Sequence, residues 1–374
     1  MEKIRTALLM FILPFLLTAG CKNKESLNKA HAIFPEEILV SPFPSLFKAD
    51  FSKGSIVQLN YQGNVVKEKQ MSAAALNFKR WNLNGNLYYS YLLCENEPKP
   101  LLGFVAGTMV VTDSSLNELK RIRLMGHPDS DDRLDGHEFI LVGENHYIIE
   151  TYFRKVVNNI PESIPHIKNC VVMTPLIQEV KDGKIIFEWD ASNFPEFYGA
   201  SVEGNQFTSS SPQDYMHLNS IFIDPKDDNL LLSFRQTDQV IKINRKSGEI
   251  MWRIGGKNSD FNLSEDQKFL RQHDATYTES NTLMLLDNGL EGKRPYSRII
   301  EFALDEESKV VADFKSTVLP DNAFITYMGS VQKQNDVYFI GGGSLPFNFE
   351  LNATSGALVK RQILSSNSYR AYKY

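Results

Sequence analysis

Three histidines of this chain stand at the same kind of position, directly ahead of an apolar, strand-like run. His137 precedes EFILVG, His217 precedes LNSIFI, and His273 precedes DATY. A neutral imidazole is both a nucleophile and a proton carrier near neutral pH, so three of them together would suit group transfer or acid–base chemistry. A single histidine is more often structural, and it is the repeated position that indicates a site.

The repeated position is defined by its distance from a turn. Counting back nine residues from a turn reaches Asn77, His137, His273 and Tyr327. His217 lies twelve residues before its turn, where the DPKDD segment is visibly longer. We therefore expect these five side chains to meet at one end of a central channel, with Asn77 and Tyr327 as substrate-binding residues.

Two further polar side chains belong to the same part of the chain. Asn219 follows His217 by two residues and so shares its strand face, and Arg235 ends the next strand-like run, LLLSFR. The guanidinium group offers a fork of donors that fits a tetrahedral oxyanion. Arginine, neutral imidazoles and an amide together would hold a sulfate or phosphate group. The alternative for Arg235 is an ion pair between neighbouring sheets.

A metal ion is the obvious rival explanation for three histidines. The only carboxylates that share their registry are Glu138 and Asp274, whose side chains alternate to the other face of the strand. This ligand set argues against a metal site. We expect neither a metal nor a cofactor.

The elements that position these residues form an internal repeat. Units with the same order of four strands begin at Asn77, His137, His217, His273 and Tyr327, at intervals of 60, 80, 56 and 54 residues. Four strands with their turns need about 40 to 50 residues, which suits a propeller blade. A sixth, less complete copy precedes them, and the fold prediction is an all-β, six-bladed β-propeller.

A ring of blades has to join its two chain ends. We expect the segment from Glu37 to Val40 to share one blade with the C-terminal part of the chain. A two-sheet sandwich with long excursions is the alternative, and it explains the period less well. The propeller is expected to comprise residues 35–374.

The interval of 80 residues contains an insert, from Ser192 to Met216, that is rich in aromatic residues. Loops of this length inside a compact fold are often functional. The insert lies just upstream of His217, so we expect it to overhang the site. We expect Phe197 and Tyr198 to contact the substrate, and the alternative is that they pack on the neighbouring blade.

The N-terminus has the layout of a secretory signal. Lys3 and Arg5 precede an apolar run, and the sequence LTAGC that ends at Cys21 resembles the lipobox of bacterial lipoproteins. We expect residues 1–20 to be the signal peptide, Cys21 to carry a lipid that anchors the chain to a membrane, and residues 21–34 to form a tether. This predicts a cell-envelope lipoprotein, periplasmic or anchored to the outer membrane; the alternative is an uncleaved anchor or a secreted protein.

Charge and cysteine content limit the partners. A net charge of −5 and a pI near 5.9 give no footprint for nucleic acid. Cys94 and Cys170 either form a disulfide in an oxidising compartment or remain two separate buried thiols. The sequence leaves this choice and the oligomeric state open.

Several segments resemble one known family. HLNSI, LLLSFR, VIKINRKSGEIMWRIGGKNSDF, RQHDA and LLDNG, in this order, look like the bacterial arylsulfotransferases, in their compact six-bladed branch. The likeness extends from about His137 to Asp313. It implies an enzyme that moves a sulfuryl group from a phenolic sulfate to a phenol without the nucleotide sulfate donor, with small aryl sulfates and phenols as its partners.

The resemblance also implies roles for five residues. His273, in the QHD motif, matches the nucleophile that forms a sulfohistidine. The other four match the GHE histidine, the HxN pair and the S-x-R arginine: His137, His217, Asn219 and Arg235. Arg235 and Asn219 would stabilise the sulfuryl oxygens, His217 would protonate the leaving phenolate, and His137 would assist.

Two other classes of function use the same channel. One is a non-catalytic propeller that binds a sulfated, phenolic or glycan ligand, and the other is a metal-dependent hydrolase. Only the sulfotransferase needs an imidazole as nucleophile.

Overall fold

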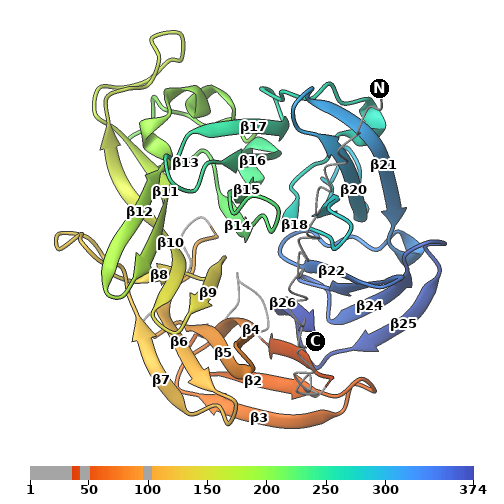
Figure 1. Ribbon diagram of the computed structural model, residues 1–374. Coiled ribbons are helices and arrows are strands. Elements are labelled where there is room, and N and C mark those ends of the chain that lie inside the picture. Colours follow the sequence, from red (N-terminus) through yellow and green to blue (C-terminus); the bar gives the residue numbers. More distant parts are fainter. Residues whose placement is uncertain (1–35, 43–50, 96–102) are drawn as a thin grey trace, which may run out of the picture. The chain divides into compact units, whose positions relative to one another are not determined.

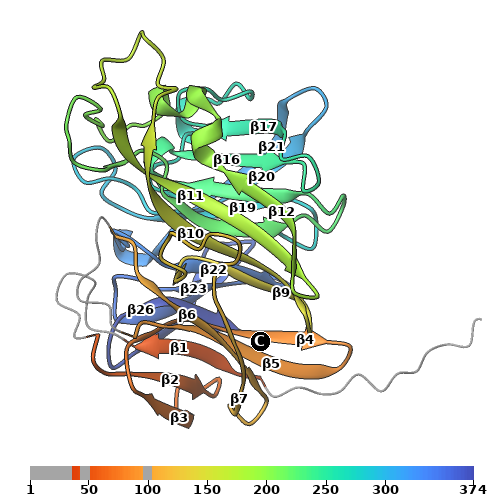
Figure 2. The same ribbon diagram turned by 90° about the vertical axis from the view of Figure 1, so that its left-hand side faces the viewer.

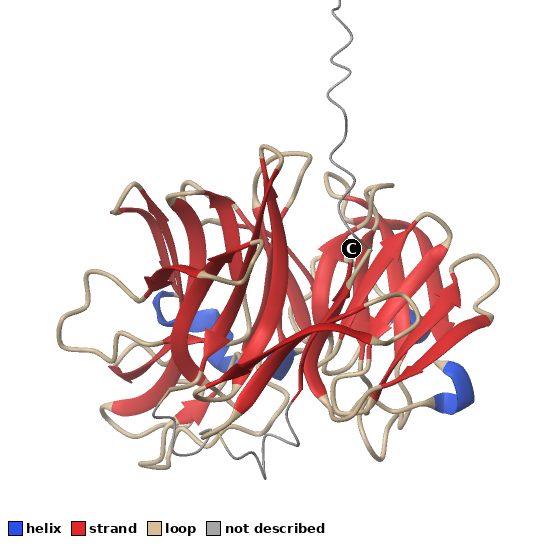
Figure 3. Ribbon diagram, turned by 90° about the horizontal axis from the view of Figure 1, so that it is seen from below, coloured by secondary structure: helices blue, strands red, loops and turns tan. Residues whose placement is uncertain are grey.

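The computed structural model describes residues 36–42, 51–95 and 103–374. The expected signal peptide, Cys21 and the tether lie outside these residues. Within the described part, no helix is long and apolar enough to cross a membrane. Figure 3 shows that this part consists almost entirely of strands and loops, as the aromatic and alternating apolar composition predicts.

Six antiparallel sheets form a ring, so the predicted six-bladed propeller is confirmed (Figure 1). The first three sheets are, from the inner strand outwards: β26 (Ser368–Lys373), β1 (Ile38–Pro42), β2 (Gly54–Leu59), β3 (Val65–Met71); β4 (Ala75–Leu83), β5 (Asn86–Leu93), β6 (Ala106–Asp113), β7 (Glu118–Ile122); and β9 (Phe139–Gly143), β10 (His146–Val157), β11 (Cys170–Lys181), β12 (Lys184–Asp190).

The other three sheets follow the chain in order. They are β14 (Leu218–Ile223), β15 (Leu230–Phe234), β16 (Gln239–Ile243), β17 (Ile250–Gly255); β18 (His273–Tyr277), β19 (Leu283–Asp287), β20 (Arg298–Asp305), β21 (Val310–Val318); and β22 (Ser330–Gln334), β23 (Val337–Gly341), β24 (Phe347–Asn352), β25 (Leu358–Ile363). Two short strands pair outside this order: β8 (Leu134–Asp135) with β6, and β13 (Gln213–Asp214) with β11. In the described part of the chain, five 3-10 helices lie in the connections: η1 (Ala191–Asn193), η2 (Pro195–Gly199), η3 (Arg235–Thr237), η4 (Glu265–Gln267) and η5 (Pro320–Asn322).

The ring closes by strand sharing, as predicted. The C-terminal strand β26 is the innermost strand of the first sheet and pairs antiparallel with β1, with Ile38 opposite Lys373 (Figure 2). Two main-chain hydrogen bonds between Glu37 and Tyr374, of 3.1 and 2.9 Å, extend the pairing. The last strand of the chain therefore lines the centre of the molecule.

Packing between sheets explains why the repeat has to close. The buried apolar side chains form six clusters, and each cluster fills the space between two adjoining sheets. A single four-stranded sheet could not bury both of its faces, so each sheet depends on two neighbours. Cys94 and Cys170 are buried thiols in two different clusters, which decides against the disulfide.

The aromatic insert departs from the prediction. Phe197 and Tyr198 are 1% and 2% exposed and pack in the cluster between the third and fourth sheets, where Trp189 and Phe234 also lie. Their assignment to substrate binding was therefore wrong, and the alternative of packing holds. The physical reason is that burying a large aromatic ring against a neighbouring sheet removes more apolar surface from water than an exposed loop would.

Arg370 of β26 ties four sheets together at the centre. Its guanidinium contacts Glu138 Oε2 at 2.8 Å, Asp274 Oδ1 at 3.3 Å and the main-chain oxygen of Asn219. The side chains of Arg370, Glu138 and Asp274 are all buried. The closing strand thus provides the positive charge paired with Asp274, and Glu138 shares this charge with that of Lys79.

Replacing this charge should destabilise the fold. Arg370→Met keeps much of the side-chain length but leaves the buried Asp274 without its ion-pair partner and Glu138 with Lys79 alone, and we expect a loss of about 3–5 kcal/mol in the free energy of unfolding. Urea denaturation measures this loss. Arg123→Met, which breaks an ion pair with Asp132 whose side chains are 46% and 52% exposed, should cost less than about 1 kcal/mol. Equal losses in the two variants would contradict the role given to Arg370.

Candidate functional site

The three histidines come together at the inner ends of three neighbouring sheets. His137 lies just before β9, His217 just before β14, and His273 begins β18. The ring centroid of His137 is 5.0 Å from that of His217 and 6.5 Å from that of His273. The residues are only 7%, 7% and 4% exposed. The repeat position thus does bring these side chains together.

A hydrogen-bond acceptor holds the Nδ1 atom of each ring. His137 Nδ1 contacts Asp135 Oδ1, His217 Nδ1 lies 2.7 Å from Asp214 Oδ2, and His273 Nδ1 lies 2.7 Å from the main-chain oxygen of Gly329. A carbonyl oxygen can only accept, so His273 carries its proton on Nδ1 and has its lone pair on Nε2.

The environment of His273 keeps the ring neutral. Burial, the charge of Arg370 and the neighbouring His137 hold the pKa of His273 well below its usual range. The hydroxyl of Tyr369 lies 3.2 Å from Nε2 and can donate to its lone pair. His273 is therefore an uncharged imidazole with a lone pair on Nε2, which is the state that a nucleophile requires.

Backbone irregularities aim the side chains at this end of the inner strands. The pairing of β14 with β15 is interrupted between Leu218 and Ser220, and that of β18 with β19 between His273 and Thr276. His217 itself has a φ of 55°. Bulges of this kind re-aim side chains and cluster near functional sites, and a non-glycine residue with positive φ persists only where its surroundings enforce it.

The carbonyl that holds His273 depends on a glycine. Gly329 has a φ of 92°, and a Cβ atom there would lie 2.7 Å from Leu286 Cδ2 and 3.0 Å from Gly341 O. A larger residue would therefore have to shift the main chain that accepts the His273 proton.

Arg235 lies beside His217 but is already paired. It begins η3, directly after β15, and its Nη1 atom lies 3.1 Å from Glu203 Oε1. The same Glu203 oxygen lies 2.9 Å from Arg271 Nη2. The main-chain amide of Arg235 donates to His217 O at 2.9 Å, so the two residues are neighbours on adjoining strand ends. The insert therefore reaches the site with carboxylates, Glu203 and Asp214, rather than with aromatic rings.

The amide side chains of Asn219 and Asn77 donate hydrogen bonds to main-chain oxygens at or next to two of the histidines. Asn219 Nδ2 donates to Gln272 O at 2.7 Å, and Asn77 Nδ2 donates to His137 O at 3.0 Å. Asn77 Oδ1 also accepts a hydrogen bond from the Tyr372 hydroxyl. Asn77 therefore positions His137 through its main chain, and its assignment to substrate binding is corrected. Asn219 is fully buried, and its Oδ1 atom has no hydrogen-bond partner.

The tyrosine that lies beside the histidines is Tyr369, not the predicted Tyr327. Tyr327 packs against the apolar cluster between the second and third sheets, whereas the tyrosine that contacts His273 is Tyr369 of β26. The registry could not find Tyr369, because the C-terminal strand begins no complete repeat. The residue that precedes Arg370 in the sequence SYRAYKY is thus a functional candidate that only ring closure identifies.

The site also contains carboxylates that the registry of the inner strands did not predict. Asp135 and Asp214 contact two of the histidines, and Glu150 of β10 lies close to Asp135 and His137. The registry of the inner strands missed them because Asp135 and Asp214 lie on the short strands β8 and β13, and Glu150 lies on a second strand. A local signal existed for two of them: an aspartate stands two residues before His137 and three before His217.

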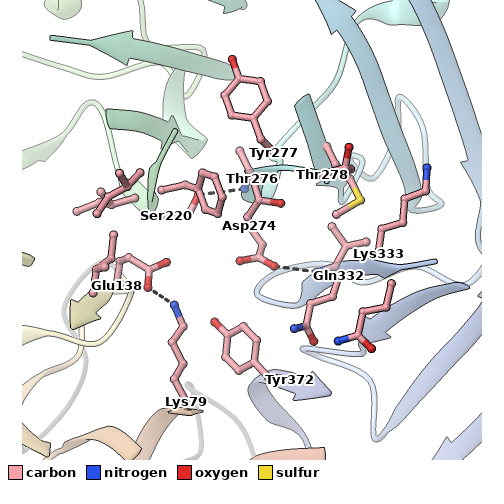
Figure 4. A pocket seen from close by; sticks show the side chains of 18 of the residues that line it. Lys79, Glu138, Ser220, Asp274, Thr276, Tyr277, Thr278, Gln332, Lys333 and Tyr372 are labelled. Atoms are coloured by element: carbon pink, nitrogen blue, oxygen red, sulfur yellow. Dashed lines mark hydrogen bonds and ion pairs between the residues drawn. The ribbon is translucent and has the colours of Figure 1, made fainter. Parts of the chain in front are cut away.

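A cavity of about 500 Å³ lies next to the histidine cluster, and its lining includes the residues that directly follow His137 and His273 in the sequence. Lys79, Glu138, Asp274 and Tyr372 line it, together with later residues of β14, β18 and β22 (Figure 4). In this view Lys79 points to Glu138, with which it forms an ion pair. The cavity runs along the inner strands away from the histidine rings.

Comparison with known proteins identifies the family. The sequence profile described as Arylsulfotransferase (ASST) matches residues 90–362, which is more than half of the chain. The chain belongs to the arylsulfotransferase family. The five residues expected from the resemblance lie within the matched segment, whereas Tyr369 and Arg370 lie beyond it. No curated protein sequence matches this member of the family.

Solved structures with a similar course of the chain have little sequence identity to this arylsulfotransferase family member. A protein of unknown function from Bacteroides caccae has a TM-score of 0.47 and 10% identity, and covers 91% of this chain and 99% of its own. Kuenenia stuttgartiensis hydrazine synthase has a TM-score of 0.47 and 12% identity over 90% and 92% of the two chains. Apo AztD from Citrobacter koseri has a TM-score of 0.42 and 6% identity over 90% and 98%. Likenesses at this level say nothing about function.

Proposed function

We propose that this protein transfers a sulfuryl group from an aryl sulfate to a phenol by a ping-pong mechanism, without a nucleotide donor. The observation that carries the proposal is the state of His273. Its Nδ1–H donates to Gly329 O, burial lowers its pKa, and its Nε2 atom, which carries the lone pair, lies 3.2 Å from the Tyr369 hydroxyl. Membership of the arylsulfotransferase family supports the same reaction class.

In the first half-reaction, His273 Nε2 attacks the sulfur atom of the donor. The bond between sulfur and the aryl oxygen breaks. Burial lowers the pKa of His217 in the empty site, whereas the anionic sulfate of the bound donor favours the protonated ring, which gives its Nε2 proton to the departing phenolate. The product is a sulfohistidine and a free phenol. Tyr369, which contacts Nε2 in the resting state, has to turn aside or follow the sulfuryl group.

In the second half-reaction, the acceptor phenol attacks the sulfohistidine. His217 Nε2 has its lone pair available because Nδ1–H is held by Asp214, and it takes the phenol proton as the sulfur–nitrogen bond breaks. The proton from the acceptor thus restores the imidazolium that the next donor needs. Arg235 stabilises the sulfuryl oxygens, and His137 assists once its Nε2 atom carries a proton that it can donate. Asn219 acts by fixing the main chain ahead of His273.

An assay with 4-nitrophenyl sulfate, with and without phenol, tests the proposal. We expect sustained release of nitrophenol only when phenol is present, with phenyl sulfate as the second product. The rate of the first half-reaction should hold as the pH falls through 6.5, because the lowered pKa keeps His273 neutral. Binding without release would favour a ligand-binding propeller, and release without phenol that a chelator abolishes would favour a metal-dependent hydrolase.

We also propose that the protein is a lipoprotein of the cell envelope, anchored through Cys21. The sequence LTAGC behind an apolar run supports this. Cys21→Ser should abolish labelling by radioactive palmitate and move the protein from the membrane fraction to the soluble fraction. Cys94→Ser, at a buried thiol, should leave the labelling unchanged. Labelling that persists in Cys21→Ser would refute the anchor.

A further inference from the structure

Three buried side chains beside the histidine cluster have the chemistry of a metal site. Among the residues that the structure describes, Asp135, His137 and Glu150 form a group whose ligand atoms all lie within 4.8 Å of one another. An imidazole and two carboxylates are ligands that bind divalent transition metals. His137 belongs to both the metal-like group and the histidine cluster, whereas His217 and His273 do not belong to the former.

The surroundings of the Glu150 carboxylate favour a bound cation. Glu150 is 1% exposed, and neither of its carboxylate oxygens has a hydrogen-bond partner. A buried carboxylate without a partner is costly, so its persistence requires a compensating group or a bound proton.

The other buried carboxylates of the described residues show how unusual this is. All but three form an ion pair with a lysine or arginine, as Glu179 does with Arg245. The exceptions are Asp135, Asp214 and Glu150, and the two aspartates contact histidines. The interior therefore neutralises its carboxylates as a rule, and Asp135 with Glu150 is the place where two negative charges meet without a lysine or arginine paired to either.

We propose that Asp135, His137 and Glu150 bind one divalent transition-metal cation of the Zn²⁺ or Mn²⁺ type. Its two charges match the two carboxylates. The amides of Val105 and His137 donate to Asp135 at 3.0 and 2.9 Å and hold this carboxylate in place. The cation would replace the proton that His137 Nδ1 shares with Asp135 Oδ1. Water would complete the coordination. The inference does not rest on the proposed sulfuryl transfer, and no step of that reaction is assigned to the cation.

Metal binding by the full-length protein tests this inference. The purified protein is freed of metal with a chelator, and binding of ZnCl₂ and, separately, MnCl₂ is measured by titration calorimetry and by metal analysis after dialysis. We expect one equivalent of one of these ions per chain. Glu150→Gln should bind it at least about tenfold more weakly, because it removes a charged ligand while keeping the shape. Asp214→Asn, at the other aspartate–histidine contact, should bind it as the unchanged protein does.

Thermal melting separates a lost ligand from a lost fold. Without metal, Glu150→Gln should melt no lower than the unchanged protein, because it removes an unpartnered buried carboxylate. The added ion should raise the melting temperature of the unchanged protein and not that of Glu150→Gln. The inference is overturned if neither ion binds, if Glu150→Gln binds as tightly, or if binding is lost in His273→Ala and retained in Glu150→Gln. Labelling of His273 by a sulfate donor is measured separately, so failure of one proposal leaves the other distinguishable.

Discussion

His273→Ala is expected to abolish both turnover and the covalent intermediate. Incubation with an aryl sulfate alone should add one sulfuryl group, about 80 Da, to the unchanged protein, because the second substrate is absent and the sulfohistidine cannot turn over. The adduct should be acid-labile and map to the peptide that contains His273. Loss of the nucleophile should cost more than loss of one oxyanion donor, which is typically about 10²- to 10³-fold in kcat.

The control for this experiment is another histidine outside the cluster. His127→Ala changes a partly exposed ring that pairs with Glu188, and it should leave the adduct in place. Intact-protein mass spectrometry and peptide mapping give the answer. An adduct that persists in His273→Ala and disappears in His217→Ala would reverse the roles assigned to the two histidines.

Asp214→Asn should have the second largest effect, and it should fall on the acceptor half of the reaction. Asp214 accepts the Nδ1 proton of His217, which leaves Nε2 free to take a proton from the phenol. An asparagine amide can instead donate to Nδ1, which would move the ring proton to Nε2. The same change in a serine-protease triad lowers kcat about 10⁴-fold, and we expect a loss of about 10²- to 10⁴-fold here.

Pre-steady-state kinetics identify the step that is lost. With 4-nitrophenyl sulfate, whose leaving group needs little help from an acid, the burst of nitrophenol should persist in Asp214→Asn while the steady-state rate falls. Asp132→Asn, at an exposed aspartate, should leave both phases unchanged. A burst that falls in proportion to the steady-state rate in Asp214→Asn would show that Asp214 does not act through the acceptor step.

Much of the architecture could be predicted from the repeated order of strands and turns. Each blade repeats the same packing problem, so equivalent residues such as His137 and His273 recur at a constant distance from a turn. The pairing of Glu37–Val40 with the C-terminal strand could be predicted for the same reason, since a ring must join its ends. These are local patterns combined with one requirement of closure.

What the tertiary structure alone decided is which groups surround those histidines. Tyr369 and Arg370 enter from a strand that begins no complete repeat, and Glu150 enters from a second strand of its sheet. At the bulge in β4, the Asn77 side chain donates to the main-chain oxygen of His137, whereas a contact with the substrate was predicted. Strand alternation determines the face on which a side chain lies. Its neighbours across the channel depend on ring closure, on backbone irregularities and on the burial of charge, and no spacing along the chain encodes these.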